Sequence, residues 1–186
     1  MTITNLHRDR RIKVMAESTK TFSNRQEKLI AKELDGCQVG GSGAAPCVPG
    51  DVRTDEWLIE CKTHTKPDQS IFFDLQVWEK IKKEAMGTHR KPALIVDDGS
   101  QTLQKTWCLC RAANLNLGST LLTDFPATIR KNVSCKHDKL SSKLKLAIKG
   151  SIMPDAFYIT YGFEVEWAGE TVIILPFESF KELYNK

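Results

Sequence analysis

The chain has 186 residues, of which 41% are hydrophobic and 27% charged, and its formal net charge is +4. These values are typical of one soluble globular domain with a substantial core, and they exclude an intrinsically disordered chain. Because no apolar run has membrane-spanning length and no secretory signal is visible, we expect a cytoplasmic protein (in the host cytoplasm if the chain is viral) that does not associate with membranes.

The N-terminal 20 residues predict a basic arm, because residues 8–13 read Arg-Asp-Arg-Arg-Ile-Lys. Residues 21–186 are expected to form a single domain. Within it we expect a core over about 21–111, a basic insertion over about 128–150, and a C-terminal hairpin and helix over about 157–186. A mild net charge means that any affinity for nucleic acid depends on such local clusters.

A first helix is predicted from about Asn24 to Leu34, with Ser23 or Asn24 as its N-cap. Its apolar residues place one face of the helix on the core. Glu27 precedes Ile30 by three residues, so we expect its carboxylate to point inward at the edge of that face. Residues 40–50, rich in Gly, Pro and Ala, predict a loop.

The next segment, from Asp51 to Lys62, predicts a β-hairpin. Its polar tip lies at Asp55 and Glu56, and its second strand begins with the apolar residues 57–59. Side chains alternate along a strand, so Glu60 and Lys62 share one face. If the chain folds back at the tip, Asp51 comes beside Glu60, and two carboxylates and an ammonium group converge.

This combination of side chains suits phosphodiester hydrolysis. Mg²⁺ binds one or two carboxylates and keeps its other positions for water and phosphate oxygens. A neighbouring lysine can orient or deprotonate the attacking water, or stabilise charge on the phosphate. The alternative is a solvated Glu-x-Lys face. The apolar residues directly before Glu60 weigh against it, since charged groups at the end of a buried strand are usually paired or ligating.

Downstream, a polar loop over residues 63–68 leads to a second helix from about Asp74 to Met86. A continuous apolar strand is predicted over residues 93–96, and another over 106–111. The pattern predicts an α/β fold, a mixed central β-sheet flanked by helices.

Six cysteines allow two interpretations. In a reducing cytosol they are free thiols. The alternative is a zinc site formed by Cys108 and Cys110 with Cys135 and His137, although both pairs lack the usual two- to four-residue spacer.

The last third contains an excess of lysine and arginine over residues 128–150, where Asp138 is the only acid. We expect Leu140, Leu144 and Ala147 to anchor a short helix there that presents lysines to phosphates. Residues 158–167 and 171–175 predict a hairpin that turns at Ala168 and Gly169, and a closing helix follows from about 176 to 184.

The order of these motifs resembles the PD-(D/E)XK nuclease superfamily, in particular the archaeal and phage Holliday junction resolvases. A helix-borne Glu27 is followed by Ser42 within Gly40–Gly43, then by Asp51, by Glu60-Cys61-Lys62 and by Gln76. The resemblance covers residues 20 to 97. One departure is that Gly50 separates Pro49 from Asp51, where many members have adjacent Pro and Asp.

The resemblance implies a restriction-endonuclease-like core with a basic C-terminal elaboration. It further implies an Mg²⁺-dependent endonuclease, with Mn²⁺ able to substitute, that cuts four-way or other branched DNA as a homodimer. The catalytic residues would be Glu27, Asp51, Glu60 and Lys62. The metal ligands would be Asp51, Glu60, the backbone carbonyl of Cys61, and Glu27. Ser42, Gln76, Arg25, His64 and Lys66 would contact the substrate.

Two alternatives stay open at this point. The same core serves restriction-type and repair or end-processing nucleases. It can also serve as the scaffold of a non-catalytic DNA-binding protein, although Asp51, Glu60 and Lys62 are all present here.

Overall fold

The computed structural model describes residues 18–40, 49–115, 133–138, 142–148 and 162–184. Over these ranges the protein is an α/β structure with a seven-stranded mixed sheet, a three-stranded antiparallel sheet and three α-helices. The large sheet has the spatial order β1 (Cys37–Gln38), β2 (Val52–Arg53), β3 (Trp57–Lys62), β5 (Lys91–Asp97), β6 (Thr106–Arg111), β10 (Glu170–Pro176) and β9 (Phe163–Trp167). The small sheet has the order β4 (Ile71–Asp74), β8 (Lys143–Ile148) and β7 (Val133–Asp138). The helices are α1 (Thr19–Glu33), α2 (Leu75–Gly87) and α4 (Phe177–Leu183), with short 3-10 turns η1 (Leu103–Lys105) and η2 (Ala112–Asn114).

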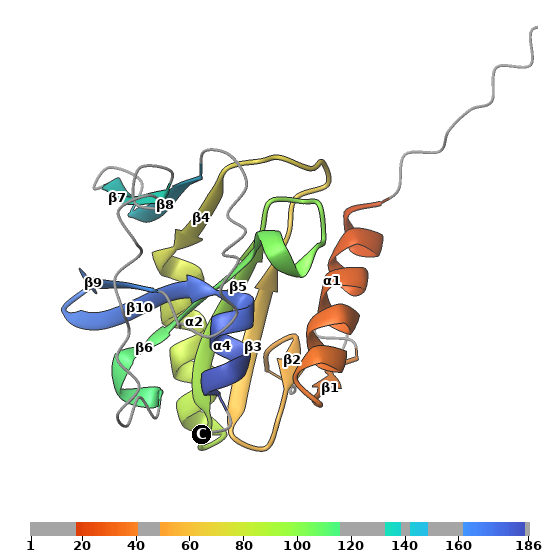
Figure 1. Ribbon diagram of the computed structural model, residues 1–186. Helices are drawn as coiled ribbons and strands as arrows, with labels where there is room; N and C mark the ends of the chain where they lie inside the picture. The colour runs from red at the N-terminus through yellow and green to blue at the C-terminus, as the bar shows by residue number, and fades with distance from the viewer. Residues whose placement is uncertain (1–17, 41–48, 116–132, 139–141, 149–161, 185–186) are drawn as a thin grey trace, which may run out of the picture.

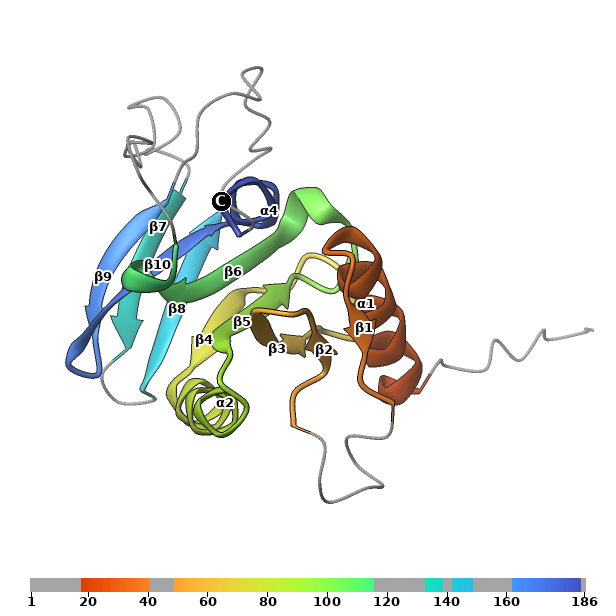
Figure 2. The same ribbon diagram turned by 90° about the horizontal axis from the view of Figure 1, so that it is seen from below.

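The large sheet is covered on both faces (Figures 1 and 2). Helices α1 and α4 pack on one face, and α2 with the small sheet packs on the other. Strand β6 shows how alternation divides the core: Cys108 and Cys110 join the cluster under α1 and α4, while Trp107 and Leu109 join the cluster under α2. The sequence-based expectation of a mixed sheet flanked by helices is confirmed.

Strands β3 and β5 are parallel neighbours near the centre of the sheet, with Glu60 opposite Leu94. The connection between them contains β4 and α2, as a parallel crossover requires. Both strands are almost entirely buried, which explains their continuous apolar sequences. The end of β3 that carries Glu60 and Lys62 therefore lies on a rigid part of the fold.

Helix α1 begins earlier than the sequence predicted. Its first residue is Thr19, and the side chain of Ser18 caps it by accepting a hydrogen bond from the Thr21 N–H. The predicted caps, Ser23 and Asn24, therefore lie inside the helix. Several serine and asparagine residues occur in this segment, and only tertiary packing decides which one caps the helix.

The lysine-rich segment was predicted as a helix, and this prediction is wrong where the segment is described. Residues 133–138 and 143–148 form the antiparallel hairpin β7–β8. Leu144 and Leu146 are buried at alternate positions while Lys145 is exposed, so a two-residue period outweighed the helical spacing of Leu144 and Ala147. Leu140 lies outside the described residues.

Strand β4 was not predicted. Ile71 and Phe73 are buried and the residues between and after them are half-buried, which is the alternation of a strand. Asp74, predicted as the first residue of the second helix, instead caps α2 by accepting a hydrogen bond from the Gln76 N–H. The small sheet formed by β4, β8 and β7 is thus the main feature missing from the predicted fold.

The C-terminal hairpin and helix are confirmed where the chain is described, with the first strand over Phe163–Trp167; residues 158–161 of the predicted strand lie outside the described residues. Strands β9 and β10 turn at Ala168 and Gly169, which both have positive φ, and α4 buries Phe177, Phe180 and Leu183. Strand β10 also pairs with β6, so the hairpin extends the central sheet and is not a separate elaboration.

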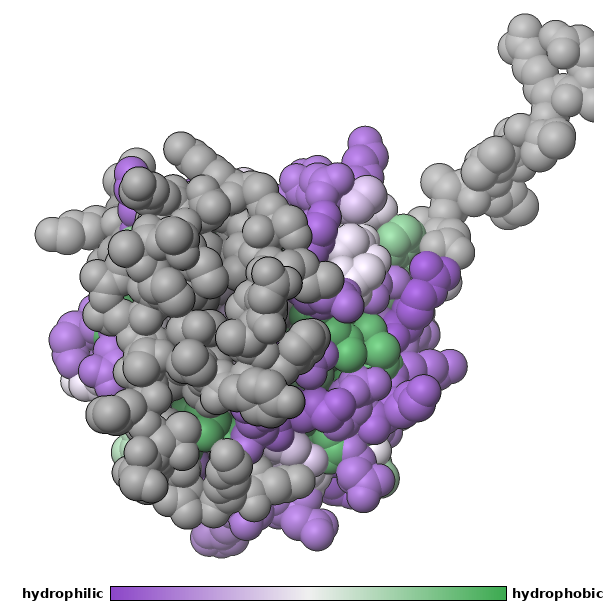
Figure 3. Space-filling view, in the orientation of Figure 1, coloured by the Kyte–Doolittle hydropathy of each residue, from purple (hydrophilic) through white to green (hydrophobic). Residues whose placement is uncertain are grey.

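The described surface in the orientation of Figure 1 is mainly hydrophilic, with apolar side chains exposed in small areas only (Figure 3). Among the described helices, none has the length and apolar character needed to cross a membrane.

Candidate active site

The β2–β3 hairpin brings Asp51 beside Glu60, as its sequence predicted. Val52 pairs with Ile59 in the antiparallel register, and the Asp51 N–H donates to the Ile59 carbonyl at 2.9 Å. The Asp51 Oδ2 accepts a hydrogen bond of 2.9 Å from the Cys61 N–H. Asp51 and Glu60 are 8% and 5% exposed, so the hairpin holds two nearly buried carboxylates side by side.

Gly50 explains why the motif reads Pro-Gly-Asp. Its φ is +74°, and a Cβ atom at this position would lie 2.8 Å from the Cδ1 of Leu58. Only glycine adopts this backbone conformation without strain and leaves room for Leu58. The departure from adjacent Pro and Asp therefore coincides with a tight packing of the first strand against the second, and it leaves Asp51 in register with Glu60.

The ammonium group of Lys62 contacts Glu60 and the main chain of Cys61. The Nζ atom lies 2.7 Å from Glu60 Oε1 and 3.2 Å from the Cys61 carbonyl oxygen. A carboxylate oxygen and a main-chain oxygen thus converge on one cationic centre. The Lys62 side chain is 48% exposed, so this point is open to solvent on one side. The Cys61 thiol, in contrast, packs in the core under α1, and Cys61 takes part in the site through its main-chain N–H and carbonyl groups.

A second lysine, which sequence reasoning did not assign to the site, comes from α2. Lys80 Nζ lies 3.5 Å from Glu60 Oε2 and 3.7 Å from Glu84 Oε1. Its position on the exposed side of the helix was visible in the sequence. Its proximity to Glu60 depends on how the β3–α2–β5 crossover packs, and nothing in the local sequence specifies that geometry.

Helix α1 contributes Glu27 and Gln26 from the opposite face of the sheet. Glu27 is 9% exposed, which confirms the inward orientation expected from helical phase, and its Oε2 accepts a hydrogen bond of 2.7 Å from Gln38 Nε2. Gln26 Nε2 donates to the Lys62 carbonyl at 3.0 Å. Gln26 and Gln38, neither of which sequence reasoning selected, thus fix the helix against the end of β3 and orient Glu27.

The electrostatics of the site are dominated by Asp51. The pKa of Asp51 is raised to about 6, mainly by burial and next by the charge of Glu60, with a smaller contribution from Glu27, while the Cys61 N–H and the Lys62 ammonium act in the opposite direction. Among the described side chains, Glu60 therefore opposes the charged form of Asp51 more strongly than Lys62 favours it. Such a site gains free energy when it binds an additional cation.

Lys62 is held in its charged form. Burial acts to lower the pKa of Lys62, but the charge and hydrogen bond of Glu60, together with the charge of Asp51, outweigh it and raise the pKa. A raised pKa favours the protonated amine, and an ammonium group in this position can orient a water molecule or stabilise phosphate charge.

The end of β5 carries two buried acids that sequence reasoning missed. Asp97 Oδ1 accepts hydrogen bonds of 2.6 Å from Thr63 Oγ1 and 2.7 Å from the Gly99 N–H, and burial, as the main cause, raises its pKa. Asp98 forms an ion pair with Lys105 at 3.2 Å. The Asp-Asp-Gly sequence directly after an apolar strand was the available signal. Because Thr63 follows Lys62, Asp97 fixes the exit of the chain from the site.

The predicted substrate-contacting residues are less closely tied to this centre. Gln76 is exposed at the start of α2, and Lys66 is exposed in the β3–β4 loop. His64 packs edge-on against Phe72. Arg25 lies over the Phe22 ring, with its Cζ atom 5.6 Å from the ring centroid. Ser42 lies outside the described residues.

The alternative zinc site is contradicted by the sheet itself. Cys108 and Cys110 are fully buried under α1 and α4, whereas Cys135 packs against the cluster on the other face of the sheet. These thiols cannot bind one ion across the sheet. The described cysteines (Cys37, Cys61, Cys108, Cys110 and Cys135) are free thiols, as the first interpretation expected.

Within the described ranges, no three His, Cys, Asp or Glu side chains gather into a metal site made of side chains alone. The set that remains consists of two carboxylates and a main-chain carbonyl. This set fits Mg²⁺ or Mn²⁺, which accept few protein oxygens and complete their coordination with water and phosphate.

Comparisons with protein-family models, with curated proteins and with solved structures gave no match to this chain.

Proposed function

We propose that this protein is a divalent-metal-dependent DNA endonuclease of the PD-(D/E)XK type. The observation that supports it most is the cluster of Asp51, Glu60 and Lys62 at one end of β3, where Lys62 Nζ lies 2.7 Å from Glu60 Oε1 and a buried Asp51 lies alongside. An excess of buried carboxylate next to a lysine on a rigid strand is a poor arrangement for stability and a suitable one for phosphodiester hydrolysis.

Asp51, Glu60 and the Cys61 carbonyl would hold Mg²⁺ or Mn²⁺, with Glu27 adding negative charge from α1. The metal, when bound, supplies Lewis-acid polarisation of the phosphate and lowers the pKa of a bound water. Because Asp51 and Glu60 are fixed by the β2–β3 hairpin, they would position the metal relative to the scissile phosphate. Lys62 orients the attacking water or neutralises charge on the scissile phosphate, and Lys80 provides a second positive charge 3.5 Å from Glu60.

The β7–β8 hairpin supports a polyanionic substrate. Lys136 and Lys145 pair directly across the two strands, and both side chains are exposed. Like charges at directly opposed positions destabilise a sheet. A phosphate backbone bound between them would remove that repulsion, and counterion release would favour binding.

A Holliday junction resolvase acting as a homodimer is the form of this activity that we favour, because the order of motifs resembles that group and two-fold symmetry provides the paired cuts that a four-way junction requires. A restriction-type or repair nuclease would use the same site on duplex DNA or on ends. A non-catalytic DNA-binding protein would show no metal-dependent cleavage.

The test is a cleavage assay with Mg²⁺ on a four-way junction, a fork, a linear duplex and a single strand of matched sequence. Symmetric nicks in the junction support the resolvase, and sequence-dependent duplex cuts support the restriction-type alternative. Asp51→Asn and Glu60→Gln should abolish cleavage while DNA binding is kept or improved, because negative charge near phosphate is removed.

Asp55→Asn is the matched control, since Asp55 is an exposed acid at the tip of the same hairpin. Cleavage at the wild-type rate by both site variants would refute the assignment of the active site.

A further inference from the structure

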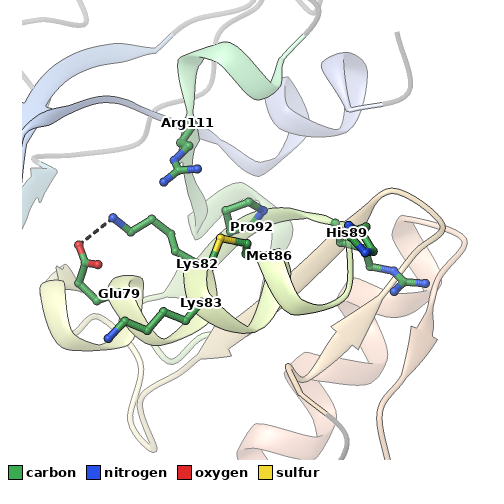
Figure 4. Close-up of a pocket in the computed structure, with 8 residues that line it drawn as sticks. Glu79, Lys82, Lys83, Met86, His89, Pro92 and Arg111 are labelled. Atoms are coloured by element: carbon green, nitrogen blue, oxygen red, sulfur yellow. Dashed lines mark ion pairs between the residues drawn. The ribbon is translucent and has the colours of Figure 1, made fainter.

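A basic pocket lies at the C-terminal end of α2, outside the candidate active site. Its volume is about 430 Å³. Residues of α2, of the turn that follows it, and of the facing ends of β5 and β6 line the pocket (Figure 4). These residues are Glu79, Lys82, Lys83, Met86, His89, Arg90, Pro92 and Arg111.

Two of its cations are held in place by one carboxylate. Glu170 accepts a hydrogen bond from Lys82 through Oε1 and one of 2.6 Å from Arg111 Nε through Oε2. The Trp78 indole N–H binds the same Glu170 Oε1 at 2.9 Å. The remaining edge of the Arg111 guanidinium therefore has a fixed direction, which lowers the entropy cost of binding a ligand there.

Arg90 is oriented differently, by main-chain carbonyl groups. Its Nε donates to the Thr54 carbonyl at 3.0 Å and its Nη1 to the Thr88 carbonyl at 3.2 Å. Neither partner carries a negative charge, so the charge of Arg90 is not neutralised by them. Lys83 and His89 are exposed, and no ion pair within the described ranges involves either of them.

The charge balance of the pocket favours an anion. Lys82, Lys83, Arg90 and Arg111 provide four positive charges, against which stand only Glu79 among the lining residues and Glu170 behind them. A concave surface with a net positive charge and several guanidinium and ammonium donors is suited to phosphate groups.

Met86 adds an apolar contact at the same place. It is 75% exposed, and among the described residues no other large hydrophobic residue is exposed. Figure 4 shows it next to Pro92, with Lys82 and Lys83 on one side and His89 on the other. Inorganic phosphate would not use such a side chain, whereas a nucleotide offers a sugar or base to pack against it.

The pocket and the candidate active site are connected by α2. Lys80 reaches Glu60, and Met86 follows six residues later, about 9 Å along the helix axis. Pro92, which lines the pocket, pairs with Leu58, two residues before Glu60 on β3. A nucleic acid molecule that crosses the exposed side of α2 can contact both places.

We propose that this pocket binds a backbone phosphate of the DNA substrate, with Met86 against the adjoining sugar or base. That the phosphate belongs to DNA rests on the proposed function. The pocket adds to that function a DNA-binding site outside the catalytic centre. The pocket adds affinity for DNA and takes no part in bond cleavage.

The test is the affinity for a fluorescent four-way junction, measured by anisotropy in EDTA so that no strand is cut. Lys83→Gln combined with His89→Gln should weaken binding about eight-fold near 0.1 M salt and lower the slope of log K against log salt by about 1, the effect of losing one phosphate contact. Met86→Gln should weaken binding without changing the slope. Lys32→Gln on α1, which also removes an exposed lysine, should change neither quantity.

Unchanged affinity and slope in the Lys83/His89 variant would overturn the proposal. The proposal would also be overturned if the pocket bound only free phosphate esters. In that case a nucleoside monophosphate would stabilise the wild-type protein but not the Lys83 variant, while the affinity for DNA would be the same for both proteins. Because the assay contains no metal, weakened binding supports the pocket even if no DNA is ever cut, and an active wild-type nuclease with unaffected variant binding refutes the pocket alone.

Discussion

Two carboxylate clusters on the same face of the large sheet, one around Asp51 and Glu60 and one around Glu170, differ in how their charge is balanced. Burial acts to raise the pKa of Glu170, but hydrogen bonds from Lys82, Arg111 and Trp78 outweigh it and lower the pKa. Burial and Glu60 instead raise the pKa of Asp51 to about 6. The Glu170 cluster is therefore neutralised by cations of its own chain.

This difference in charge balance supports the proposal that the cluster at Asp51 and Glu60, and not the one at Glu170, binds the metal. A carboxylate already bound by two cations and an indole contributes to stability and has no need of a further ligand. Two adjacent buried carboxylates repel each other, and a cation bound between them would relieve that repulsion. Both clusters involve α2, through Lys80 in one case and Lys82 in the other.

The largest expected effect concerns the cations at Glu60. Lys62→Met should lower the rate of DNA cleavage by about 10³-fold, because it removes the group that orients water or stabilises phosphate charge. Lys80→Met should lower it by about ten-fold, since Lys80 lies farther from Glu60 and adds charge only. Single-turnover rates on the preferred DNA check both. Equal losses in the two variants would contradict the distinct role of Lys62.

Asp51 should make the stability of the protein depend on pH. Its pKa of about 6 when folded exceeds the ordinary 3.8, so the folded chain holds a proton that the unfolded chain releases between these values. The free energy of unfolding should therefore fall by about 3 kcal/mol as the pH rises from about 4 to about 6, and then level off.

Urea unfolding across this pH range provides the measurement. Asp51→Asn should remove the decrease and be more stable than wild type near neutral pH, whereas Asp55→Asn should follow wild type. An unchanged pH profile in Asp51→Asn would show that Asp51 is not the proton-binding group.

Gly50 should be more sensitive to substitution than Gly169. Both have positive φ, +74° and +79°, but only Gly50 has atoms within 3 Å of a Cβ, those of Leu58. We expect Gly169→Ala to cost about 1 kcal/mol and Gly50→Ala about 2 kcal/mol or more, measured by thermal unfolding. Gly50→Ala should also reduce cleavage, because it displaces Asp51. Similar costs at both glycines would remove the packing argument for Pro-Gly-Asp.

The effect expected at Glu170 is confined to stability. Glu170→Gln should lower the free energy of unfolding by about 1.5 kcal/mol, since Lys82 and Arg111 lose their shared charged partner. The rate of DNA cleavage at saturating DNA should stay at the wild-type value. A large loss of that rate would mean that the balanced cluster also takes part in catalysis.

The sequence was sufficient where local geometry decides the outcome. Hairpin register placed Asp51 beside Glu60, and helical phase turned Glu27 inward. It was insufficient where distant packing decides. The period-two Lys-Leu-Lys-Leu sequence before Ala147 was compatible with a strand, but its partner β4 was not recognised. The contact of Lys80 with Glu60 arises from a crossover whose packing leaves no local signal.

The most direct test of the central claim is calorimetric titration of Mn²⁺ into wild type, Asp51→Asn, Glu60→Gln and Asp55→Asn, near neutral pH and without DNA. If the cluster on β3 is a metal site, wild type and Asp55→Asn bind one ion with the same affinity, and the two site variants bind it at least about ten-fold more weakly. Equal binding by all four proteins would place the metal elsewhere and contradict the assignment.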